Sequence, residues 1–264
     1  MTRRAAVREA DESNAAEARL GNRSVTRALA ILGLLAHAGR PMTLAEIAAE
    51  QRLPKSSVLS LLRALAGSEF AVTDERGRYS VGLRSFEVGA AYLRSMTPVR
   101  AAESELQALT EALGATSHFA VLEGDEVVYL AKHDPPGAGL RLASSVGARL
   151  PAATTAVGKA QLAHGPWSSA RPGALGGPGA GPGLAAELEA VRALGYALDE
   201  GQTMPGIRCV AAPVFSLGDC CGAIGVSYLI HSGLQLEIVA RAVVAAAVQA
   251  SARLGAPRAG ERAG

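Results

Sequence analysis

The chain has 264 residues, of which 49% are hydrophobic, 19% charged and 4% aromatic, and its formal net charge is +2. These values describe a folded protein large enough for two domains and exclude a largely disordered chain. Its three cysteines form no CxxC pair, which argues against a disulfide scaffold and favours a reducing cytoplasm. We expect neither a signal peptide nor a membrane span, because the longest apolar stretch, 238–250, is short and interrupted by Arg241.

Positive charge is concentrated in the front part of the chain. Residues 23–94 contain nine Arg and one Lys against six acidic residues, a local net charge of +4. The remainder must then be mildly acidic, which fits one module that faces nucleic acid and one that faces a metabolite. Residues 1–22 are polar without a consistent apolar face, and we expect a disordered leader there and a short tail at 257–264.

The first three predicted elements are helices. Residues 23–39 keep a 3.6-residue apolar rhythm at Val25, Ala28, Leu29, Leu32, Leu35 and Ala36. Thr43 is a good N-cap for the second helix, and Glu46 three residues later completes a capping box. The third helix follows Pro54 and closes at Gly67.

The third helix carries the most informative pattern in the chain. Its buried stripe is predicted at Val58, Leu61, Leu62 and Leu65. The opposite face presents short hydroxyls and one cation, at Ser56, Ser57, Ser60 and Arg63, residue types that suit the floor of a DNA groove. A merely solvated helix surface is the alternative. A strand at 70–73, a turn at Gly77 and a strand at 78–81 then complete a winged helix-turn-helix domain over residues 23–82.

We expect the winged helix to contact both the phosphates and the bases of DNA. Phosphate contacts are assigned to cations and base contacts to the hydroxyl face. The candidate DNA-binding residues are Arg27, Thr43, Lys55, Ser56, Ser57, Ser60, Arg63 and Arg78. A linker follows at 83–98; its helix, 83–94, has an apolar stripe at Leu83, Phe86, Ala90 and Leu93, which we expect to pack on a partner.

Residues 99–256 alternate between helical and strand patterns. We predict helices at 99–113, 154–163, 184–194 and about 234–254. Strands are predicted at 116–123, 127–132, 140–144, 196–199, 209–215 and 223–229. Residues 165–183 are rich in Gly, Pro and Ser and indicate a loop. The whole chain is therefore α+β, with a mixed sensor domain built on an antiparallel sheet.

The ordered series of motifs resembles the IclR-type transcriptional regulators. It runs from SVTRALAIL through LAEIA, LPKSSV, RYSVG and VYLAK to GARLPAATTAVGKA and LGYALDEG, and ends in GIRCVAAPVF. The resemblance implies a GAF/PAS-like effector domain and dimers, or tetramers of dimers, on palindromic operators. It also implies that Arg27 lies near DNA and that Ser56 and Ser57 begin the recognition helix.

The resemblance further implies an effector pocket lined by Ala156, Asp199, Cys209 and Ser227. Gly225 stands where the family has the first of two pocket serines. Two more departures are Ser60, where the family usually has Arg, and Ala153, where it often has His.

We therefore predict a ligand-responsive regulator, a repressor rather than an activator, that binds duplex DNA and a small organic acid or aromatic metabolite. The alternatives are a GAF-like thiol enzyme acting through Cys209, or a winged helix that docks protein or RNA. The five histidines are scattered without ligand spacing, so we expect no metal, and Gly158-Lys159 lacks the other residues of a P-loop. No catalytic residue and no cofactor is predicted.

Overall fold

The computed structural model describes residues 23–137, 144–165, 181 and 183–256. It divides into two compact units, the first ending at Tyr92 and the second beginning at Leu93. The predicted leader 1–22, the tail 257–264, most of the predicted strand 140–144 and most of the loop 165–183 lie outside the described residues. None of the helices in the described ranges is long and apolar enough to cross a membrane.

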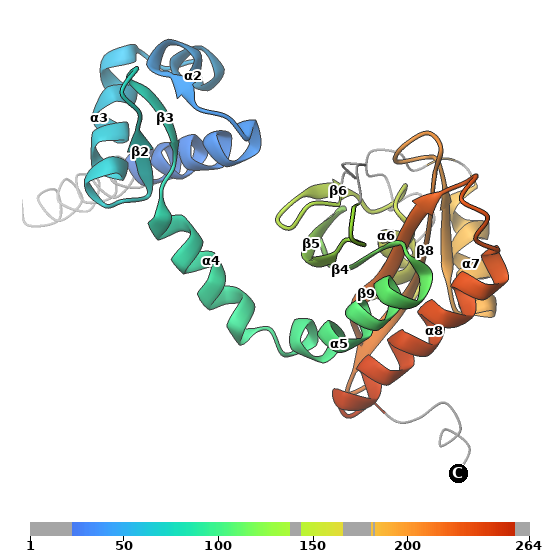
Figure 1. Ribbon diagram of the computed structural model, residues 1–264. Helices are drawn as coiled ribbons and strands as arrows, with labels where there is room; N and C mark the ends of the chain where they lie inside the picture. Colours follow the sequence, from blue (N-terminus) through green and yellow to red (C-terminus); the bar gives the residue numbers. More distant parts are fainter. Residues whose placement is uncertain (1–22, 138–143, 166–180, 182, 257–264) are drawn as a thin grey trace, which may run out of the picture. The chain divides into compact units, whose positions relative to one another are not determined.

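The first unit is three helices and a small antiparallel sheet (Figure 1). Residues 23–38 are helical, and α2 (Leu44–Gln51) and α3 (Lys55–Gly67) follow. Strands β2 (Ala71–Thr73) and β3 (Arg78–Val81) form the wing, and the short strand β1 (Met42–Thr43) adds to the free edge of β3. The sequence prediction missed β1, whose two residues are too few to show an alternating pattern.

The core of this unit lies where the three helices meet the sheet. Its fully buried side chains are Ile31, Ile47, Val58 and Leu62. The stripe predicted on α3 is confirmed, since Leu65 is also buried and Leu61 packs against the same cluster. The apolar pattern predicted for the first helix is partly wrong. Its buried side chains are Ile31 and Leu35, with Ala28 packed against them. Val25 and Leu29, which were predicted to be buried, are 58% and 61% exposed.

Helix α4 (Leu83–Ser95) leads from the first unit into the second, and no residue of it is buried. Its first turn is fixed to the wing, because the Ser85 hydroxyl donates to the carbonyl of Phe70. Leu83 and Phe86 are each 70% exposed. The predicted helix is therefore present; Leu83 and Phe86 of its apolar stripe are exposed, whereas Ala90 is half-buried and Leu93 packs against the core of the second unit.

The second unit is built on one six-stranded antiparallel sheet. The strands are β4 (Thr116–Glu123), β5 (Glu126–His133), β6 (Arg149–Pro151), β7 (Ala197–Glu200), β8 (Ile207–Ser216) and β9 (Asp219–Leu229). Their spatial order is β6-β5-β4-β9-β8-β7. Five of them agree with the predicted strands to within four residues at each end. The sixth, β6, is a three-residue edge strand that the sequence pattern did not reveal.

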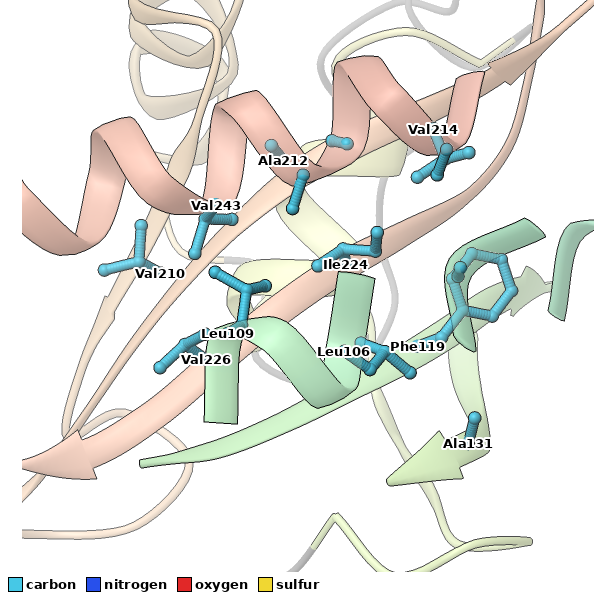
Figure 2. Packing of buried hydrophobic residues seen from close by; sticks show 14 of the residues in the cluster. Leu106, Leu109, Phe119, Ala131, Val210, Ala212, Val214, Ile224, Val226 and Val243 are labelled. Atoms are coloured by element: carbon cyan, nitrogen blue, oxygen red, sulfur yellow. The ribbon is translucent and has the colours of Figure 1, made fainter. Parts of the chain in front are cut away.

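Two long helices cover one face of this sheet, and two shorter helices lie on the other side of it. Figure 2 shows Val210, Ala212 and Val214 of β8 pointing, at every second position, toward α5 (Thr97–Leu113) and α8 (Leu236–Arg253). Helix α6 (Ala156–Leu162) packs on the opposite face, and α7 (Leu184–Leu194) packs on α6 and β7. Strand residues between those of the first set therefore face α6.

Candidate functional site

The helix-turn-helix is held by a capping box and a left-handed turn. The Thr43 hydroxyl accepts the backbone N–H of Glu46 at 3.3 Å, and the Glu46 carboxylate accepts the Thr43 N–H at 2.7 Å. The Thr43 N–H and the Thr43 hydroxyl, which donates to the same carboxylate at 2.7 Å, lower the pKa of Glu46 to about 2, with a weaker contribution from Arg40. Helix α2 ends at Arg52, whose positive φ of 53° turns the chain toward Pro54 and the start of α3. The prediction of a capping box is confirmed.

The hydroxyl face of α3 is open. Lys55, Ser56, Ser60 and Arg63 are exposed and Ser57 is half-buried. Within the described ranges, neither Lys55 nor Arg63 takes part in an ion pair, so both charges are available to a phosphate. The buried leucine stripe on the opposite side fixes the direction in which these side chains project.

The other candidate DNA contacts stand in different situations. Arg27 is exposed on the first helix. The Thr43 hydroxyl is engaged in the capping box. Arg78 is ion-paired within the wing, its Nε lying 2.8 Å from Asp74 Oδ2, so its charge is largely compensated. Arg76, at the exposed tip of the same turn, was not singled out from the sequence.

The residues predicted to bind an effector come together because the antiparallel register places them in neighbouring rows. Asp199 of β7 is paired with Cys209 of β8, and Cys209 is paired with Ser227 of β9. In the next row of the same face, Gly225 of β9 is paired with His118 of β4. Four strands thus bring residues separated by up to 109 positions onto one surface under α6.

A pocket lies between this surface and the start of α6. It contains about 20 Å³ of space into which the centre of a water molecule fits. Four of the five predicted effector residues are on its lining: Ala156, Asp199, Cys209 and Ser227. The other lining residues are His118, Tyr129, Ser144, Leu150, Thr155, Val157, Thr203, Met204 and Ile207.

The polar groups of the pocket differ in how far they are already paired. Asp199 is 2% exposed, and its Oδ1 accepts the backbone N–H groups of Gln202 and Thr203. The Cys209 Sγ lies 3.0 Å from the Ser227 hydroxyl. Burial raises the pKa of the Cys209 thiol to about 12, so the sulfur is a protonated thiol and not a nucleophilic thiolate.

Gly225 is the predicted effector residue that the structure does not bring onto the lining. A Cβ atom at this position would lie 2.6 Å from His118 Nε2 and 3.0 Å from Val157 Cγ1. The imidazole of His118 therefore occupies the space where a side chain at 225 would project. Sequence reasoning missed His118, and its only available signal was the glycine that faces it across the two strands.

The Gly158-Lys159 pair has a packing role. A Cβ at Gly158 would lie 2.1 Å from the carbonyl oxygen of Ala152, so only glycine allows α6 to approach that backbone. Lys159 is 2% exposed and ion-paired, with Nζ 2.7 Å from Glu187 Oε2 and 2.8 Å from Gln202 Oε1. No group of His, Cys, Asp and Glu in the described parts of the chain could hold a metal ion.

Two family descriptions match nearly all of the described chain. The IclR helix-turn-helix domain matches residues 24–75, and the C-terminal domain of the bacterial transcriptional regulator IclR matches 90–172 and 180–254. The chain belongs to the IclR family. It is therefore a DNA-binding transcription regulator of IclR type, and regulators of this family bind DNA and small-molecule effectors.

Named relatives agree with this assignment. The transcriptional regulator BhcR of Paracoccus denitrificans is 35% identical, with 92% of this chain and 91% of BhcR aligned. The repressor AllR of Klebsiella pneumoniae is 27% identical over 80% of this chain and 81% of AllR. A solved IclR regulator from Alicyclobacillus acidocaldarius is 31% identical, with a TM-score of 0.76 over 88% of this chain and 99% of its own. An IclR homologue from Microbacterium hydrocarbonoxydans, solved with 4-hydroxybenzoate, shares the fold at 21% identity and a TM-score of 0.75, over 89% of this chain and all of its own.

Proposed function

We propose that this IclR-family chain is a repressor that binds a palindromic operator as a homodimer or a tetramer. A small organic acid or aromatic metabolite in the pocket of the second unit would change its affinity for DNA. The observation that carries the proposal is the open face of α3, where short hydroxyls and unpaired cations project from a helix whose other face is fixed in the core. The relative AllR is itself named a repressor.

In this proposal α3 lies in the major groove. Ser56, Ser57 and Ser60 would read base edges, and Lys55 and Arg63 would contact phosphates on either side. Arg27 would add a phosphate contact from the first helix. Arg78 would contribute less, because Asp74 already compensates its charge. Thr43 would position α2 at the backbone through its cap and would not contact a base itself.

One winged helix offers few base contacts, so useful affinity requires two. The exposed apolar side chains of α4 provide a surface for pairing two chains. Two half-sites about 34–36 Å apart, one turn of the DNA helix, would then be read together. A ligand that favours one arrangement of the two winged helices needs a coupling free energy of only about 1–3 kcal/mol to change affinity 5- to 150-fold.

The test is a gel shift of the full chain, at several salt concentrations, on DNA from upstream of its own gene. We expect Ser57→Glu with Arg63→Glu to abolish the shifted band, since one carboxylate would face the bases and the other would replace a cation at the phosphates. The matched control is Ser232→Glu with Arg241→Glu, the same charge change at exposed positions of the second unit. Equal DNA binding by both double variants would exclude α3 as the recognition helix.

A thiol enzyme acting through Cys209 has less support. The Cys209 thiol is protonated and hydrogen-bonded to the Ser227 hydroxyl. Cys220 and Cys221 lie at the other end of the β8–β9 pair. Burial raises the pKa of both of those thiols as well, to about 12 and about 11. None of the three is activated for attack.

A further inference from the structure

An imidazole on the lining of the pocket has an enclosed ring nitrogen without a hydrogen-bonding partner among the described residues. His118 is 1% exposed and lies on the pocket lining. Its Nδ1 is enclosed and forms no hydrogen bond with any part of the described chain. The ring makes an edge-to-face contact with Tyr129, at 5.2 Å between centroids, which orients the ring without pairing a nitrogen.

The imidazole of His118 fits at this place only because the residue opposite it is a glycine. Gly225 lies directly opposite His118 in the β4–β9 register, and any larger residue there would displace the imidazole. The ring therefore takes the volume that a side chain at 225 would otherwise contribute to the pocket. The identity of the polar group on this wall depends on the His118–Gly225 pair and not on either residue alone.

A second buried polar group on the same lining is also unpaired. The hydroxyl of Ser144 is enclosed and has no partner among the described residues. Oδ1 of Asp199, Cys209 Sγ and the Ser227 hydroxyl already pair with the protein. Nδ1 of His118 and the hydroxyl of Ser144 are the fully enclosed side-chain atoms of the lining that have no partner among the described residues, and buried groups of this kind are normally satisfied.

Burial also keeps the ring uncharged. Desolvation lowers the pKa of His118 to about 3, so near neutral pH one ring nitrogen donates and the other accepts. A hydroxyl can serve either nitrogen, because it both donates and accepts. A methyl group of the same size can serve neither.

We propose that His118, held over Gly225, determines which effector the pocket accepts, by pairing with a hydroxyl group on a small, otherwise apolar molecule. The inference rests on the proposed effector function and adds to it the residue that selects the ligand. Leu150, Val157 and Ile207 would hold the apolar part of that molecule. The space open to the centre of a water molecule in this pocket is only about 20 Å³, so binding of a larger molecule requires the walls to move outward.

The experiment measures binding of matched probes to the full chain by calorimetry. Three pairs differ only in a hydroxyl replaced by a methyl group: lactate and isobutyrate, 3-hydroxybutyrate and 3-methylbutyrate, 4-hydroxybenzoate and 4-methylbenzoate. For the pair that fits, we expect the hydroxyl member to bind at least about tenfold more tightly, because an unpaired buried group corresponds to a factor of roughly 5 to 150. The amide of the better probe tests whether its carboxylate is also needed.

Two substitutions assign the preference to His118. His118→Phe keeps a ring without nitrogens over Gly225, and it should reduce the preference for the hydroxyl probe over the methyl probe to less than about threefold. If the larger phenyl ring prevents folding, His118→Leu removes the ring nitrogens instead. His164→Phe is the matched control, since His164 also has an enclosed, unpaired ring nitrogen and an edge-to-face contact, with Phe215, but lies outside the pocket. This variant should keep the preference of the unmodified chain.

Three results would overturn the inference: equal binding of both members of every pair, a preference that persists in His118→Phe or His118→Leu, or no binding of any probe at millimolar concentration. None of these results bears on DNA binding, which the gel shift measures separately. Failure of ligand selection by His118 is therefore distinguishable from failure of the regulator assignment.

Discussion

At the scale of single residues, His118 is a group whose burial makes stability depend on pH. Its pKa is lowered to about 3 in the folded chain, whereas an exposed histidine in the unfolded chain has a pKa of 6.5. Between these values the unfolded state binds the extra proton, so stability rises with pH through this window and is lost as the pH falls below about 6.5. Above 6.5 both states are neutral and the dependence disappears.

We therefore predict that the unfolding free energy of the second unit falls on acidification from pH 7 to pH 5 by up to about 1.4 kcal/mol per pH unit. Urea titrations at the two pH values measure it. His118→Phe should reduce this slope, because one titrating group is gone, and His164, whose pKa burial also lowers, accounts for part of what remains. A variant with the slope of the unmodified chain would assign the acid sensitivity to other groups.

Part of the pocket lining was predicted from the sequence, through the resemblance to a family. Ala156, Asp199, Cys209 and Ser227 matched family positions, and they lie on one lining. His118 matched no motif, and one of five scattered histidines gives no local signal. Its role depends on the pairing of β4 with β9, which joins positions 118 and 225. Contacts of that range are not visible in a linear pattern.

At the scale of elements, the two strands that the sequence did not reveal are β1 and β6, with two and three residues. The equally short strand β2 was predicted because the turn at Gly77 pairs it with β3 in a hairpin, and no such turn marks β1 or β6. The first helix was predicted, but the wrong face of it was expected to be buried. Its Leu, Val and Ala residues are spread around the helix, and only packing selects the face with Ile31 and Leu35. Capping residues were the more reliable guide to where helices begin.

The capping box of α2 gives a prediction for the winged helix. Thr43→Ala removes the acceptor for the Glu46 N–H, and we expect a loss of about 1 kcal/mol in the stability of the first unit. Ser56→Ala, on the exposed first turn of α3, is the control and should change stability by less than about 0.5 kcal/mol. Urea unfolding followed by circular dichroism measures both.

The same box makes the first unit sensitive to acid. The pKa of Glu46 lies near 2 in the folded chain and near 4.5 when unpaired, so the carboxylate stabilises α2 above about pH 4.5. This contribution is lost as the pH falls from 4.5 toward 2. The difference between Thr43→Ala and the unmodified chain should therefore shrink in this range, and a difference independent of pH would contradict the assigned role of the Thr43–Glu46 pair.

At the scale of the whole molecule, the two units are joined through a helix, α4, of which no residue is buried. Every residue of α4 has at least part of its surface exposed, and several of its large apolar side chains face outward. A thirteen-residue helix with so little packing gains almost no stability from the chain it belongs to. A partner surface would both stabilise it and bring two winged helices under common control.

This leads to the prediction that α4 sets both the assembly and the affinity for DNA. Leu83→Glu with Phe86→Glu places two charges among its exposed apolar side chains, and we expect the proposed dimer to dissociate at micromolar concentration. Because a monomer offers a single half-site contact, operator affinity should fall at least about tenfold, while the folded structure of each unit is kept. Sedimentation equilibrium measures the mass, and fluorescence anisotropy with a labelled operator measures the affinity.

The control is Leu194→Glu, which places a charge on an apolar side chain that is 57% exposed at the end of α7. It should leave the dimer and its affinity for the operator unchanged. The α4 variant must also retain the circular dichroism spectrum of the unmodified chain, so that a smaller mass reflects dissociation and not unfolding. Two results would show that α4 is not the pairing surface. One is an unmodified chain that sediments as a monomer, and the other is an α4 variant that still binds the operator as a dimer. The two half-sites must then be joined through the second unit instead.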